Sequence, residues 1–154
     1  RTMHGFLKPG GTMLHHCIAR RAKPAHRKKY ITKEKRLLLK YIFPGSELDE
    51  IGNQASQFEL HGFEVHDIEA IREHYALTCE HWARRLQERK DEALRLVGPE
   101  KYRLWLLYLA GVSLGFYEGS MVIFQTLVTK RGEKGPSGLP AGRFDMYAEP
   151  IRSV

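Results

Sequence analysis

The sequence has few cysteines and no long apolar run. Its 154 residues include two cysteines, Cys17 and Cys79, and neither belongs to a CxxC pair. This excludes a disulfide framework, a zinc ribbon and a thioredoxin-like redox centre, and it favours a reducing compartment. The longest nearly apolar run, 104–116, has 13 residues, whereas a membrane-spanning helix needs about 20. We interpret this run as a buried helix, with Trp105 and Tyr108 in the core.

Acidic residues are scarce near the N-terminal end. The first 40 positions hold 12 of the 25 Lys and Arg residues but a single acid, Glu34. Such a basic block suits nucleic acid, an anionic membrane surface or an anionic substrate. Its densest part, 19–36, has no apolar face at helical spacing, and Tyr30 is its one aromatic residue. Because no nucleic-acid-binding motif occurs, we expect no nucleic-acid partner. A solvated surface and a contact with an anionic surface stay open as alternatives.

Motifs for metal or nucleotide binding are missing as well. No HExxH sequence or Cys/His cluster occurs, and His74 and His81 are two helical turns apart, so we expect no metal site. The segment GVSLG (111–115) follows no predicted strand, and we interpret it as helix packing rather than a cofactor loop.

Strand-like and helix-like segments alternate along the chain. The expected strands are 12–18, 63–68 and 121–129, and the expected helices are 34–41, 47–62, about 74 to 97, and 100–118. We expect Ser46 to cap the second helix and Gly98-Pro99 to separate the last two. Helices between strands predict an α/β sheet with parallel crossovers. Because the apolar strand 12–18 resembles a central strand with no partner before it, we expect the C-terminal part of a larger sheet domain.

Several segments resemble one protein family. The turn LKPGG precedes strand 12–18, the string YIFPG follows at 41–45, and GFEVHDIEAIREHYALTCEHWARRL and YRLWLLYLAGVSLGF follow at 62–86 and 102–116. This order is similar to the C-terminal half of cyclopropane-fatty-acyl-phospholipid synthases and mycolic acid cyclopropane synthases. The resemblance implies strands five to seven of a class I, Rossmann-like methyltransferase sheet, with inserted helices that wall a lipid tunnel. We divide the chain into this half-domain, 1–130, and an irregular tail rich in Gly and Pro, 131–154.

The resemblance implies an enzyme that uses S-adenosylmethionine to methylate a cis double bond in an unsaturated phospholipid acyl chain. Loss of a proton then closes a cyclopropane ring, with bound bicarbonate as the base. The residues that bind S-adenosylmethionine would lie upstream, so we expect this chain to be inactive alone. A methyl-branched or methylene fatty acid as product, and a non-catalytic lipid-binding subunit, stay open as alternatives.

The same resemblance indicates where the protein works and with what. We expect a cytoplasmic protein that contacts the inner face of the membrane peripherally, where the basic block 19–36 could hold anionic headgroups. Its expected partners are an unsaturated membrane phospholipid and either a second copy in a homodimer or a complementing N-terminal half.

Three residues carry the expected site. His16 matches a family histidine at the end of strand five and Tyr75 matches the tyrosine of an HYA motif, and the resemblance implies that both bind bicarbonate. Phe43 matches an aromatic residue of the acyl pocket, where a ring face can stabilise a cation by roughly 0.5–2 kcal/mol. The residues alone also fit a core histidine, a core tyrosine and a helix-end packing residue. Because side chains alternate along a strand, His15 points away from His16.

Overall fold

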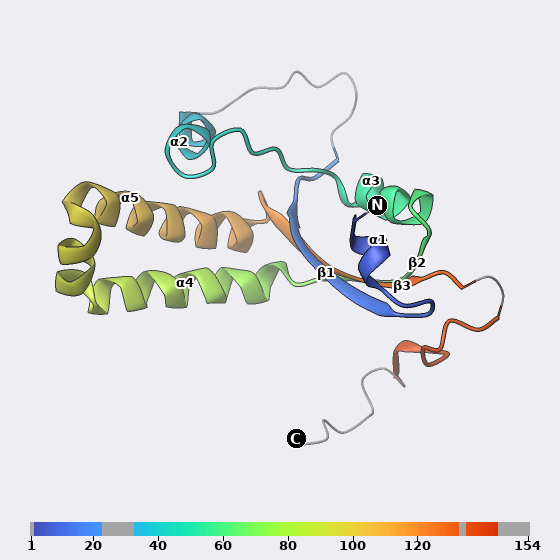
Figure 1. The fold of residues 1–154 in the computed structure, drawn as a ribbon. Coiled ribbons are helices and arrows are strands. Elements are labelled where there is room, and N and C mark those ends of the chain that lie inside the picture. Colours follow the sequence, from blue (N-terminus) through green and yellow to red (C-terminus); the bar gives the residue numbers. More distant parts are fainter. Residues whose placement is uncertain (1, 23–32, 133–134, 145–154) are drawn as a thin grey trace.

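The computed structural model describes residues 2–22, 33–132 and 135–144 (Figure 1). Its elements in chain order are α1 (Thr2–Phe6), β1 (Thr12–Ala19), α2 (Lys33–Tyr41), α3 (Ile51–Leu60), β2 (Phe63–Ala70), α4 (Arg72–Glu88), α5 (Lys90–Glu118) and β3 (Val122–Lys130). Each strand, and helix α2, begins and ends within two residues of its predicted bounds. The short helix α1 was not predicted. Residues 23–32, which are most of the basic block 19–36, lie outside the described residues.

Within the described residues, the strands form one antiparallel sheet in the order β1-β3-β2. Leu127 of β3 lies opposite Leu14 of β1, and Val128 lies opposite Val65 of β2. The predicted parallel crossovers are therefore wrong for β3. The reason is that α4 and α5 form a hairpin, which returns the chain to the end of the sheet where β2 stops (Figure 1). The next strand must then run in the opposite direction.

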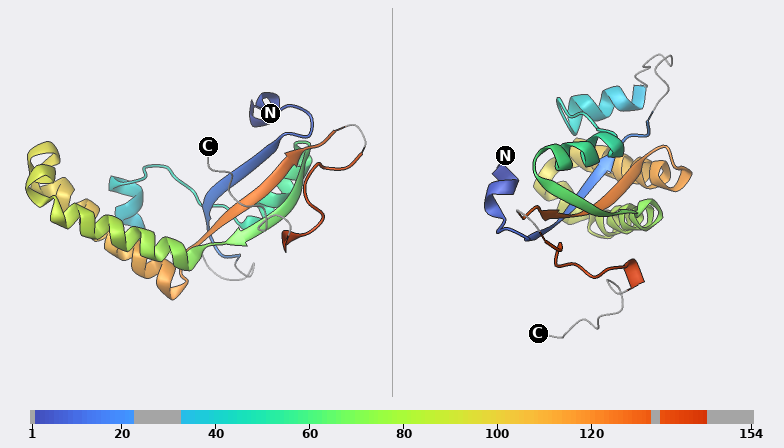
Figure 2. Two further views of the ribbon diagram at one scale, coloured as in Figure 1. Left: turned by 90° about the horizontal axis from the view of Figure 1, so that it is seen from below. Right: turned by 90° about the vertical axis from the view of Figure 1, so that its right-hand side faces the viewer.

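The α4–α5 hairpin projects away from one end of the sheet (Figure 2). Helix α4 ends at Glu88 and the backbone leaves the helical region at Arg89, so the predicted continuation of the α4 stripe to residue 97 is wrong. As predicted, Gly98 and Pro99 interrupt the second arm, where Gly98 has φ 77° and ψ 169°. Glycine adopts such angles without a steric penalty, and proline cannot donate the next helical hydrogen bond.

Among the described residues, two apolar clusters attach the helices to the sheet. The first lies at the base of the hairpin and includes the buried side chains of Cys79, Phe116 and Ile123. The second joins Phe58 of α3 to Val128 of β3. Ile123 and Val128 are five positions apart in one strand and so point to opposite faces. The hairpin and α3 therefore use different faces of the sheet.

Two expectations of deep burial are wrong. β1 is an edge strand of the described sheet, and its Leu14 side chain is 58% exposed. In helix 100–118 one stripe packs against α4 and the sheet, whereas Leu107 on another side is 69% exposed. None of the helices in the described part of the chain is long and apolar enough to cross a membrane.

Helix α3 begins later than the sequence predicts. Ser46 does not cap it, since Glu50 precedes its first residue and no side chain caps that end. The Arg20 backbone N–H donates to the Asp49 carbonyl oxygen at 2.9 Å, and the Arg20 side chain pairs with Glu50. These contacts hold the chain extended beside the end of β1 until Ile51.

Candidate functional site

His16 and Tyr75 meet at the end of the sheet from which the hairpin projects. His16 lies in the second half of β1, and Tyr75 lies at the end of the first turn of α4. Their ring centroids are 5.6 Å apart with the planes inclined at 50°. His16 is exposed and Tyr75 is half-buried. The structure therefore brings together the two polar side chains that the resemblance implied, on a surface open to solvent in this chain.

Gln125 of β3 faces His16 across the strand pair. The two residues are register partners, and the Gln125 amide Nε2 lies 3.4 Å from His16 Nδ1. An amide nitrogen donates hydrogen bonds, so Nδ1 accepts this long and weak contact in the tautomer that carries its proton on Nε2. In that tautomer Nε2–H is the donor of the ring. No sequence pattern singles out Gln125, because its position opposite His16 depends on the order of the strands.

Tyr75 packs against an apolar wall. The ring of Phe116 is 5.1 Å and that of Trp82 5.9 Å from the Tyr75 ring, both edge-on. Burial, together with the Cys79 thiol, raises the pKa of Tyr75 above its ordinary value of 10.0. The phenol therefore stays protonated near neutral pH and can donate a hydrogen bond to an anion. Burial also raises the pKa of Cys79, which keeps this thiol neutral and poorly nucleophilic.

Phe43 contacts an aromatic side chain of α5. Its ring lies 5.6 Å from that of Tyr108, which in turn lies 5.5 Å from Trp105. Tyr108 packs on the first apolar cluster, as its assignment to the core predicts. Trp105 is 43% exposed, so the core assignment is wrong for it. The three-residue spacing of Trp105 and Tyr108 places both rings on one side of α5, a signal already present in the sequence.

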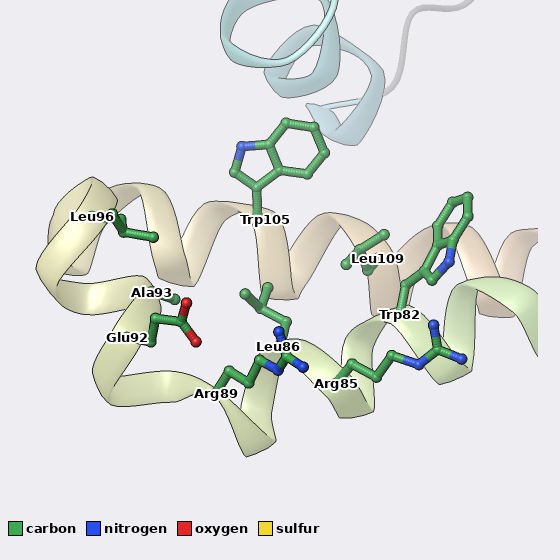
Figure 3. Close-up of a pocket in the computed structure, with 9 residues that line it drawn as sticks. All are labelled: Trp82, Arg85, Leu86, Arg89, Glu92, Ala93, Leu96, Trp105 and Leu109. Carbon is green, nitrogen blue, oxygen red and sulfur yellow. The ribbon is translucent and has the colours of Figure 1, made fainter.

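A pocket of about 530 Å³ opens between the arms of the hairpin (Figure 3). Leu86 points from α4 toward α5, and Arg85 and Arg89 extend along the edge formed by α4. Trp82 lines this pocket and also contacts Tyr75. The pocket therefore adjoins the His16–Tyr75 pair through one shared indole.

His15 lies on the opposite face of β1, as strand alternation predicts. Its ring is 5.2 Å from that of Phe58 in α3. Burial, and to a lesser extent His16, lowers the pKa of His15 from 6.5. His15 is therefore a packing residue of the second cluster and stands apart from Tyr75.

The segment GVSLG (111–115) lies inside α5, where its backbone N–H groups belong to the helix. Across residues 2–22, 33–132 and 135–144, no three His, Cys, Asp or Glu side chains gather in a way that could hold a metal ion. The polar chemistry of this site consists of the His16 imidazole, the Tyr75 phenol and the Gln125 amide.

Comparisons with known proteins give a consistent picture. A family model described as mycolic acid cyclopropane synthetase matches residues 1–126. A probable fatty acid methyltransferase from Pseudomonas putida is 32% identical over 145 residues, which are 94% of this chain and 36% of that protein.

Solved structures extend this likeness to the fold. The cyclopropane synthase MmaA2 from Mycobacterium tuberculosis matches with a TM-score of 0.73 and 27% identity, over 83% of this chain and 47% of that one. The mycolic acid cyclopropane synthase CmaA1, complexed with SAH and CTAB, matches with a TM-score of 0.66 and 26% identity, over 78% and 44% of the two chains. The chain spans less than half the length of each of these proteins. The likeness confirms the predicted fold, the C-terminal part of an α/β methyltransferase sheet.

Proposed function

Since this chain belongs to the mycolic acid cyclopropane synthetase family, we propose that it is the lipid-facing half of an S-adenosylmethionine-dependent methyltransferase. The complete enzyme methylates a cis double bond in an unsaturated phospholipid acyl chain and closes a cyclopropane ring. It works in the cytoplasm, at the inner face of the membrane, paired with a second copy or with a complementing N-terminal half. The observation that carries this proposal is the approach of His16 to Tyr75 beside an apolar wall.

In this proposal His16 and Tyr75 hold a bicarbonate ion that acts as the base. The donors are the Nε2–H of His16 and the neutral phenol O–H of Tyr75, on rings 5.6 Å apart. Two directed donors suit an oxyanion with several acceptor atoms. His16 and Tyr75 would orient this bicarbonate, which would supply the base for the proton that the added methyl carbon loses as the ring closes. The methyl donor itself is held by residues outside this chain.

The aromatic wall supports the same proposal. Phe116 contacts the Tyr75 ring, Tyr108 packs on the same apolar cluster, and Phe43 contacts Tyr108. Aromatic faces stabilise a nearby cation by roughly 0.5–2 kcal/mol, which suits the positive charge that forms on the alkylated chain. Water would trap such a cation, so the open side of His16 must be covered in the working enzyme.

The proposal is tested with His16→Ala and Tyr75→Phe in the complete enzyme. We expect turnover to fall about 10²–10⁴-fold, the usual contribution of a placed acid or base, with lipid affinity nearly unchanged. Tyr117→Phe is the matched control, because it removes the same hydroxyl from a side chain that is 75% exposed. Full turnover in both site variants would refute the catalytic role and favour a lipid-binding subunit.

A methyl-branched fatty acid is the second candidate product, and the name of the Pseudomonas putida relative favours it. Ring and branch share the same cation and differ in which carbon loses the proton. Proton NMR of the extracted lipids distinguishes the two, because cyclopropane protons resonate apart from those of a methyl branch.

A further inference from the structure

We propose that one face of the α4–α5 hairpin docks this protein on an anionic lipid bilayer. This proposal rests on the proposed lipid function and deepens it by naming the surface that meets the membrane. We call this surface the hairpin face. Its residues are Trp82, Arg85, Leu86, Arg89, Leu96 and Trp105.

The hairpin face exposes large apolar side chains on a projecting element. Leu96 is 76% exposed, and Trp82 and Trp105 are each 43% exposed. Exposed apolar side chains that gather around one open pocket indicate an interaction site, whereas single exposed apolar residues do not. Indole rings are favoured at membrane interfaces, since each has an apolar body and a polar N–H. The hairpin carries them away from the sheet (Figure 2), where a flat partner can reach them.

The charges on the hairpin face complement lipid phosphates. Arg85 and Arg89 are exposed, and neither takes part in an ion pair among the described residues. Glu92 is the acidic residue that lines the same pocket. Residues 84–103 contain seven Lys and Arg against four acids. Guanidinium groups bind phosphate oxygens in pairs of hydrogen bonds, so this edge favours anionic headgroups.

The position of the hairpin face also suits transfer of an acyl chain. Trp82 contacts Tyr75 on one side and lines the hairpin pocket on the other. Trp105 contacts Tyr108, which contacts Phe43. A chain that leaves a bilayer at this face therefore follows aromatic side chains to the His16–Tyr75 pair.

Binding to vesicles tests the docking proposal with the 154-residue chain and without any reaction. We expect sedimentation with phosphatidylglycerol-containing vesicles, much less with pure phosphatidylcholine, and weaker binding at high salt. Leu96→Glu should weaken binding by about tenfold or more, since it replaces an inserted apolar side chain with a charge. Leu60→Glu is the matched control, with the same charge change at a leucine that is 75% exposed on α3. Its affinity should stay that of the parent.

The two tryptophans give a direct report on this surface. The sequence contains no others, and both belong to the hairpin face, so binding should shift their emission to shorter wavelength. Each of Arg85→Gln and Arg89→Gln should weaken binding about fivefold, the usual effect of one basic residue at an anionic membrane.

Several results would overturn the docking proposal. They are a lack of vesicle binding, equal losses in Leu96→Glu and Leu60→Glu, and binding without a change in tryptophan emission. Failure of the catalytic proposal is distinct from these results. In that case Tyr75→Phe keeps its turnover in the complete enzyme, whatever the vesicles show.

Discussion

Phe116→Ala should remove the contact that holds the hairpin, and with it Tyr75, against the sheet. Phe116 has no exposed surface, and its ring lies 5.1 Å from that of Tyr75. Truncating a core phenylalanine to alanine costs about 3–5 kcal/mol of unfolding free energy. The free energy of unfolding of a domain is about 5–15 kcal/mol in total, so this substitution removes a large part of it. At roughly 2–4 °C per kcal/mol, the melting temperature should fall by about 6–20 °C.

Urea unfolding followed by circular dichroism measures this loss. Tyr117→Ala is the control, because the next residue of α5 is an aromatic side chain that points to solvent and should change stability by less than about 0.5 kcal/mol. Equal losses in the two variants, or a loss below about 1 kcal/mol for Phe116→Ala, would refute the burial of this ring between hairpin and sheet.

Three further changes test local features of the fold. Gly119→Ala should lower the unfolding free energy by about 1–2 kcal/mol, because its φ is +79° and a Cβ would lie 2.9 Å from Arg21 Nη2. Gly111→Ala, in open space on α5, should raise the unfolding free energy by up to about 1 kcal/mol. Thermal unfolding measures both glycine variants, and changes of the same sign would contradict this geometry. Because burial lowers the pKa of His15 from 6.5, the unfolded chain binds more protons in acid, and stability should fall as the pH drops below 6.5. His15→Gln should flatten that fall in urea titrations at several pH values, and an unchanged slope would show that His15 is not responsible.

Local patterns predict much of the fold. The apolar stretch 12–18 and the half-buried pattern of 63–68 place β1 and β2, and the Gly98-Pro99 pair marks the break in α5, since these signals depend on neighbouring residues. The direction of β3 depends instead on the hairpin formed by α4 and α5. The turn at Arg89 carries no Gly or Pro signal, so the end of α4 at Glu88 could not be predicted from the sequence.

The residues of the candidate site could also be predicted only in part from the sequence. The family motifs single out His16 and Tyr75, and strand alternation separates His15 from them. Gln125 could not be found before the strand order was known, because it is 109 positions from His16 in the chain. The exposure of Trp105 was likewise unpredictable, since apolarity on most sides of α5 suggests burial and the hairpin offers cover on one side only.

A double-mutant cycle on the turnover of the complete enzyme, with His16→Ala, Tyr75→Phe and their combination, tests the shared anion most directly. If both side chains hold one ion, the first substitution already disables it and the second adds little. We predict that the double variant turns over at nearly the rate of the slower single variant. A double variant whose loss equals the product of the two single losses would contradict a shared anion.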